Sequence, residues 1–69
     1  MTLSEEQKLI IEGLKICNVK KENIIIISLL LKTEEQQWQM LDFLETAVEN
    51  PPSDETLLAI ARRIASETE

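Results

Sequence analysis

The chain has 69 residues, which is enough for one small domain and too few for a second. Thirteen acidic residues against seven basic ones give it a formal net charge of -6. It contains no histidine and a single cysteine, which excludes a Ser-His-Asp or Cys-His nucleophile system, a histidine-containing zinc site and an internal disulfide. The length therefore predicts a single domain over residues 1–69. Because no base titrates near neutral pH, we expect no enzymatic activity. We also expect neither cofactor nor metal.

The first helix is predicted over residues 4–17. Ser4 and Gln7 have the spacing of a capping box, in which two side chains satisfy each other's backbone donors. Asn18 follows the last apolar position and favours the left-handed backbone that ends a helix. One broad apolar face lies between these signals, formed by Leu9, Ile10, Gly13, Leu14 and Cys17.

The second helix is predicted over residues 21–32, and it has no polar face. Its run of isoleucines also favours a strand. A lone strand would leave its backbone groups unpaired, however, so a helix is the better interpretation. A helix that is apolar all round is expected to be central, with neighbours on every side. One side carries Ile24, Ile27 and Leu31, and the opposite side carries Ile25, Ile26 and Leu29.

The third and fourth helices are predicted over residues 34–49 and 54–66. Thr33 and Gln36 repeat the capping-box spacing, and Ser53 precedes two acids that suit the positive end of a helix dipole. Asn50 is expected to adopt a left-handed conformation, and Pro51-Pro52 prevents the third helix from continuing. The inward stripes are Met40, Leu41, Leu44, Ala47 and Val48, and then Leu57, Leu58, Ile60, Ala61, Ile64 and Ala65.

These elements predict an all-α fold, a compact bundle of four short helices. The segment from Ser4 to Gln7 returns as Thr33 to Gln36, and each copy opens a pair of helices. A true internal repeat and shared capping chemistry both account for this similarity.

Several short segments together resemble short all-helical proteins encoded by gut Firmicutes. The resemblance covers residues 3–65 and implies a bacterial protein with the same helical fold. It implies no activity and no functional residue. The segments that carry it are Leu3–Lys8, Asn18-Val19, Leu31–Gln36, Met40–Leu44 and the proline pair before the last helix.

Two reactive side chains have ordinary structural explanations. Cys17 lies on the apolar face of the first helix, near a helix C-terminus that opposes a thiolate, so we expect a core residue. Ser28 lies within the second helix, where a serine hydroxyl usually donates to the carbonyl four residues earlier. The modified serine of acyl carrier proteins follows an aspartate at the start of a helix, and Ser28 follows Ile27.

Exposed apolar residues are the first candidates for a binding surface. The outer side of the second helix offers Ile25, Ile26 and Leu29. Trp38 and Phe43 lie at the two edges of the third helix's apolar stripe, where an aromatic residue belongs either to the core or to an interface.

Acidic residues are the second candidates. Between Lys32 and Arg62 the chain has seven acids and no base. Most such runs are solvated helix faces, and the ligand spacing of an EF-hand is absent. A basic protein partner is the alternative. The candidate acidic face consists of Glu35, Asp42, Glu45 and Glu49.

Other partner classes are disfavoured. A net negative charge repels nucleic-acid phosphates. The longest uncharged run, residues 23–31, is far below the roughly 20 residues that span a bilayer, and no signal peptide is apparent, so we expect a cytoplasmic protein. The sequence therefore predicts a non-enzymatic protein-interaction module, a homodimer that self-associates through the second helix. The alternative is an acidic inhibitor or mimic that covers a basic surface of a partner.

Overall fold

A computed structural model describes residues 3–67, and these form four α-helices and no strand. This confirms the predicted all-α fold. The helices are α1 (Glu5–Ile16), α2 (Lys21–Leu30), α3 (Glu34–Ala47) and α4 (Asp54–Glu67). The predicted bounds of α1 and α4 are correct to within a residue, whereas α2 and α3 end earlier than predicted, at residues 30 and 47.

The predicted helix starts are confirmed by their hydrogen bonds. Both capping boxes are complete, since Ser4 and Gln7 exchange bonds at the start of α1, as do Thr33 and Gln36 at the start of α3. The Ser53 hydroxyl accepts a bond of 3.3 Å from the backbone N–H of Thr56 at the start of α4. The polar residues placed before each apolar run therefore fix where three of the four helices begin.

The end of α1 is a Schellman motif. Asn18 has a φ of 63°, as predicted, and its N–H donates to the carbonyl of Lys15 at 2.9 Å. The N–H of Val19 donates to the carbonyl of Leu14 at 3.0 Å. These two bonds satisfy the last carbonyls of the helix and turn the chain directly into α2.

The predicted left-handed conformation of Asn50 is wrong. Among residues 3–67, Asn18 alone of the non-glycine residues has a positive φ. Asn50 immediately precedes Pro51, and the proline ring pushes the residue before it toward extended backbone. The N–H of Asn50 instead closes a turn on the carbonyl of Ala47 at 3.2 Å. α2 also stops early, because Leu31 takes an extended conformation and enters the core.

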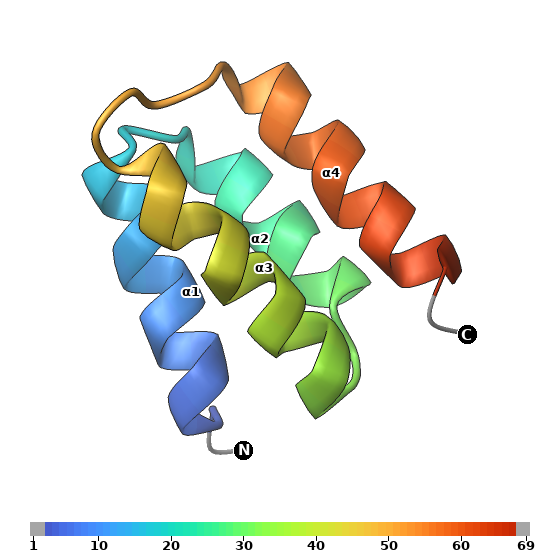
Figure 1. Cartoon of the computed structure of the whole chain (residues 1–69). Helices are drawn as coiled ribbons and strands as arrows, with labels where there is room; N and C mark the ends of the chain where they lie inside the picture. The colour runs from blue at the N-terminus through green and yellow to red at the C-terminus, as the bar shows by residue number, and fades with distance from the viewer. Residues whose placement is uncertain (1–2, 68–69) are drawn as a thin grey trace.

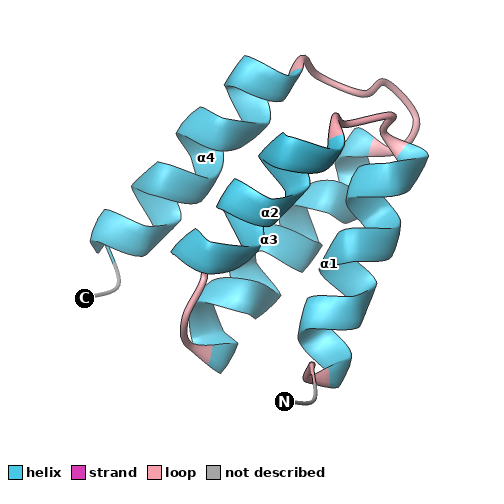
Figure 2. Ribbon diagram, turned by 180° about the vertical axis from the view of Figure 1, so that it is seen from behind, coloured by secondary structure: helices cyan, strands magenta, loops and turns pink. Residues whose placement is uncertain are grey.

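The four helices form a closed ring in the order α1, α3, α4, α2. α1 packs against α2 and α3, and α4 packs against the same two helices. The diagonal pairs, α1 with α4 and α2 with α3, have no Cα atoms within 8 Å of each other. Figure 1 views the molecule with α3 in front, and Figure 2, from behind, has α2 in front. The edge between α1 and α3 therefore lies opposite the edge between α2 and α4.

The core lies inside this ring and takes residues from every helix. Cys17 is buried in it, as predicted. The Ser28 hydroxyl donates to the carbonyl of Ile24 at 2.9 Å, also as predicted. The buried apolar residues are Ile10, Leu14, Cys17, Val19, Ile27, Leu31, Met40, Leu44, Ala47, Leu57, Ala61 and Ile64.

The expected central position of the second helix is wrong. α2 has packing partners on only two sides, α1 and α4, because each helix of the ring contacts just two neighbours. Its outer side therefore meets solvent. Two residues assigned to inward stripes, Leu9 in α1 and Val48 after α3, are also exposed. Both line a depression between α1 and α3, at the outer margin of the contact between these helices.

Candidate functional site

The first candidate surface is the outer side of α2, formed by Ile25, Ile26 and Leu29 and called here the α2 surface. Their exposed fractions are 51%, 39% and 69%. These values agree with the side of the helix predicted to point away from Ile24, Ile27 and Leu31. In Figure 2 this helix lies nearest the viewer, with nothing in front of it.

A shallow depression of about 310 Å³ extends the α2 surface toward α3 and α4. Ile26, Leu29 and Leu30 supply its α2 wall, Gln36 and Ala65 belong to the other two helices, and Lys32 lies in the turn that follows α2. The wall is apolar because the C-terminal half of α2 contains no charged residue. Three neighbouring exposed apolar side chains make this side of α2 a candidate protein contact, whereas a single exposed leucine would need no explanation.

The second candidate surface is a groove between α1 and α3, called here the α1–α3 groove. It has a volume of about 330 Å³. Trp38 is 48% exposed and lines the groove, so it lies outside the core. Phe43, its predicted counterpart, is half-buried and packs against the core. The apolar walls are formed by Leu9 and Ile16 of α1 and by Trp38, Leu41 and Val48.

Gly13 explains why the base of this groove is so close to the core. A Cβ atom placed on Gly13 would lie 3.2 Å from the Cδ1 of Leu44, which is closer than an ordinary van der Waals contact. The glycine therefore allows α1 and α3 to approach each other at this point. Leu9 and Ile16 lie on either side of Gly13 along α1, seven residues apart, and form the α1 wall of the groove.

The predicted acidic face runs along the outside of α3 and continues to Glu49, just beyond its end. Glu35, Asp42, Glu45 and Glu49 are all exposed, and Trp38 lies among them at the same helical spacing of three and four residues. Glu45 also lines the α1–α3 groove, as does Glu12 from the facing helix. The acidic face and the aromatic residue are thus parts of one surface.

None of these carboxylates forms an ion pair with another residue of the part of the chain that the structure describes. Within residues 3–67 the ion pairs join Lys8 to Glu5 at 3.8 Å and Arg63 to Glu67 at 3.5 Å, and both pairs are exposed. The same residues contain no cluster of three or more potential metal ligands. The α3 acids therefore present negative charge to solvent without internal compensation.

Asp54 makes a polar contact that the sequence did not reveal. Its Oδ2 accepts bonds from the Asn23 side chain at 2.7 Å and from the backbone N–H of Lys20 at 3.1 Å. The Asn23 bond, with help from the Lys20 N–H, lowers the pKa of Asp54 below its ordinary value of 3.8. α2 has no side-chain cap of its own, so this residue of α4 supplies one. The contact is structural, and it joins the starts of α2 and α4.

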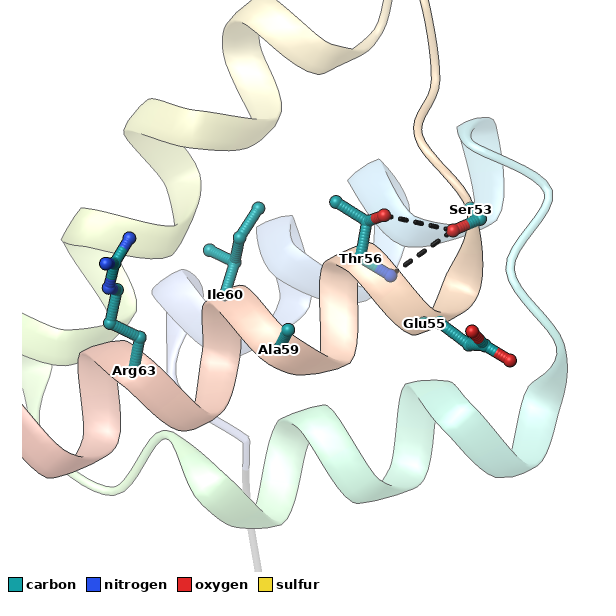
Figure 3. Close-up of a pocket in the computed structure, with 6 residues that line it drawn as sticks. All are labelled: Ser53, Glu55, Thr56, Ala59, Ile60 and Arg63. Atoms are coloured by element: carbon teal, nitrogen blue, oxygen red, sulfur yellow. Dashed lines mark hydrogen bonds between the residues drawn. The ribbon is translucent and has the colours of Figure 1, made fainter.

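A further depression of about 440 Å³ runs along α4 and is shown in Figure 3. Its hydroxyls are bonded to each other, since the Ser53 oxygen lies 3.0 Å from that of Thr56. Glu55 and Arg63 lie at opposite ends of the row of side chains in Figure 3. All the lining residues belong to α4 and its cap, and no pair of them is arranged for acid–base chemistry.

The structure divides the predicted interface into two surfaces. Ile25, Ile26 and Leu29 lie on the α2 side of the ring, and Trp38 lies on the opposite edge with the acidic residues. Sequence reasoning missed Leu9, Ile16 and Val48 as exposed residues. The spacing of seven between Leu9 and Ile16 was the available signal, because it places both on one line along α1.

Comparisons with known proteins add no assignment. No family model, no curated protein and no solved structure matches the chain. Within residues 3–67, none of the helices has the length and apolar character needed to cross a membrane.

Proposed function

We propose that this protein is a non-enzymatic interaction module that forms a homodimer through the α2 surface. The observation that carries the proposal is the exposure of Ile25, Ile26 and Leu29 together on one side of α2. Covering apolar area stabilises an association by roughly 25 cal/mol per Å² removed from water. Such residues are retained at a surface most simply when another protein covers them.

A second copy is the simplest occupant of this surface. Most soluble oligomers are two-fold symmetric dimers, in which one patch pairs with itself. The α2 surface suits such pairing because its three residues are uncharged and impose no like-charge repulsion. A domain of this size also buries only about 60% of the surface of its unfolded chain, so it gains from further burial. We place the dimer in the cytoplasm, where the single thiol of Cys17 stays reduced.

Light scattering at micromolar concentration tests the proposal. The wild-type protein should have twice the chain mass of 7.9 kDa. Leu29→Glu, which places a charge in the centre of the α2 surface, should give the monomer mass. Leu9→Glu is the matched control, because Leu9 is similarly exposed but lies on the opposite edge, and it should remain dimeric. A wild-type monomer at every concentration would exclude the dimer.

The α3 acids support a second candidate function, an acidic inhibitor or mimic that covers a basic surface of a partner. Glu35, Asp42, Glu45 and Glu49 are exposed and unpaired, which leaves their charge available to a basic protein. Binding of this kind is steered by charge and weakens steeply as salt is added. Affinity for a basic partner that does not change with salt would argue against this candidate.

A further inference from the structure

We propose that the α1–α3 groove binds one amphipathic helix of a partner protein, with an apolar stripe that enters the groove and lysine or arginine residues along the flank that faces α3. This proposal deepens the acidic-surface candidate by naming the chemistry of its ligand. It does not depend on the α2 dimer, because the two surfaces lie on opposite edges of the ring.

The apolar walls have the length that a docked helix needs. Leu9 and Ile16 on one wall are seven residues apart, as are Leu41 and Val48 on the other. At 1.5 Å per residue each pair spans about 10 Å, or two helical turns. A ligand helix with apolar residues at positions i, i+3, i+4 and i+7 presents a stripe of the same length.

Trp38 gives the groove the anchor that such interfaces use. It is half-exposed in the free protein, although it is the largest side chain of the domain. Along α3, its neighbour Leu41 lines the groove, Glu45 lies at the groove's rim, and Asp42 lies on the outer side. Trp38 is the first of the α3 residues that line the groove, so a ligand helix that covered it would bury a large apolar ring at one end of the contact. Tryptophan is enriched among the few residues that carry most of the binding energy of an interface.

The rims of the groove determine the charge of the ligand. On α3 the rim is wholly acidic, and Glu45 lines the groove itself. On α1 the rim is mixed, because Glu12 lines the groove while Lys8 and Lys15 lie farther round the helix. A basic flank against α3 therefore meets only opposite charge, whereas an acidic flank would face unpaired carboxylates.

This charge pattern also selects among classes of partner. Nucleic-acid phosphates and anionic lipid surfaces would meet the acidic rim with like charge. A second copy seated groove to groove would bring two acidic rims together with like charge. One seated through a different surface would build a ring or an open chain rather than a closed dimer. A basic amphipathic helix from another protein fits both the apolar walls and the rim.

The test uses a model peptide of about 18 residues, long enough to form a stable helix when bound. It carries leucine at positions i, i+3, i+4 and i+7, lysine along one flank of that stripe and alanine elsewhere. A scrambled peptide of the same composition and an otherwise identical peptide with glutamate in place of lysine are its controls. The readout is the fluorescence of Trp38, the only tryptophan in the chain, together with calorimetry. The protein carries Leu29→Glu throughout, so that any dimer is absent from the measurement.

We expect the leucine–lysine peptide to shift the Trp38 emission to shorter wavelength and to bind much more tightly than either control peptide. Glu12→Lys combined with Glu45→Lys should weaken binding at least about tenfold, which corresponds to 1.4 kcal/mol. Glu22→Lys combined with Glu55→Lys changes the net charge by the same amount away from the groove. This second pair should weaken binding less than about threefold, as is usual for distant exposed charges.

Several results would overturn the proposal. Equal weakening by the two pairs of substitutions would show only general attraction between opposite charges. An unshifted Trp38 emission would show that the peptide binds elsewhere. Equal affinity for the scrambled peptide would show that binding does not require an amphipathic helix. Leu9→Ala, which adds no charge, gives a second measurement and should weaken binding without changing the circular dichroism of the free protein. Unchanged affinity in that variant would contradict the assigned walls.

Discussion

Replacing Gln36 with alanine should destabilise the protein more than replacing Gln7, although the two residues hold the same position in two similar capping boxes. The Gln7 side chain accepts one hydrogen bond, from the backbone N–H of Ser4 at 2.9 Å. Gln36 accepts bonds from Thr33 at 3.0 Å and from Lys32 at 2.8 Å. It also donates to the carbonyl of Ala65 in α4 at 3.4 Å. The second box therefore connects the α2–α3 turn, α3 and α4.

The expected magnitude follows from these bonds and from burial. A hydrogen bond contributes about 1 kcal/mol net, so Gln7→Ala should lower the free energy of unfolding by about 1 kcal/mol. Gln36→Ala removes two short bonds and one long one, and the Gln36 side chain is only 3% exposed. The two short bonds account for about 2 kcal/mol, and loss of a buried methylene adds about 0.8 kcal/mol. The total is about 3 kcal/mol, a difference of about 2 kcal/mol between the variants.

Urea unfolding followed by circular dichroism measures this difference, with thermal unfolding as a second readout. A difference of 2 kcal/mol should separate the two melting temperatures by roughly 10 °C in a domain of this size. The Ser4 and Thr33 hydroxyl bonds remain in both variants, so the comparison isolates the glutamine side chains. Equal losses of stability in the two variants would refute the reasoning, because the bonds of Gln36 to the turn and to α4 would then contribute nothing.

Two further substitutions test contacts between helices. The pKa of Asp54 is lowered by Asn23, so its ionised form stabilises the fold above about pH 3.8, and this contribution is lost as pH falls through the lower, folded-state value. Asp54→Asn should therefore reduce the free energy of unfolding at neutral pH, and the difference from wild type should shrink in acid. A difference that stayed the same at every pH in urea titrations would contradict this. Gly13→Val should cost about 1–3 kcal/mol by overpacking against Leu44. This exceeds the few tenths of a kcal/mol that valine regains over glycine in a helix, so an unchanged urea midpoint would contradict overpacking at this contact.

Local chemistry made most of the fold predictable. The capping boxes at Ser4 and Thr33 and the left-handed Asn18 depend only on residues close in the chain, and all three are confirmed. The cap that Asp54 supplies to α2 depends on two residues more than thirty positions apart. No local sequence pattern predicts a contact between residues so far apart, so it becomes visible only in the three-dimensional structure. Asn50 was mispredicted because the following proline overrides its own preference.

The sequence predicted most of the residues that belong to the candidate surfaces, but not which of these residues share a surface. Helical periodicity identified the outer side of α2 correctly, because that side is a property of one helix. Whether Trp38 joins Leu29 or the acidic residues depends on the order of the helices around the ring, which the periodicity of single helices does not contain. Leu9 was assigned inward for a similar reason, since an apolar face wider than its contact leaves its margin in solvent.

The most direct test of the account is an isotope-filtered NMR measurement on a mixture of labelled and unlabelled copies. Contacts between copies should then appear between the methyl groups of Leu29 and those of Ile25 and Ile26, and they should disappear in Leu29→Glu. The same spectra should show no contact between copies at Leu9 or Ile16. The absence of any contact between copies at Leu29, or contacts confined to the α1–α3 groove, would contradict a dimer formed through α2.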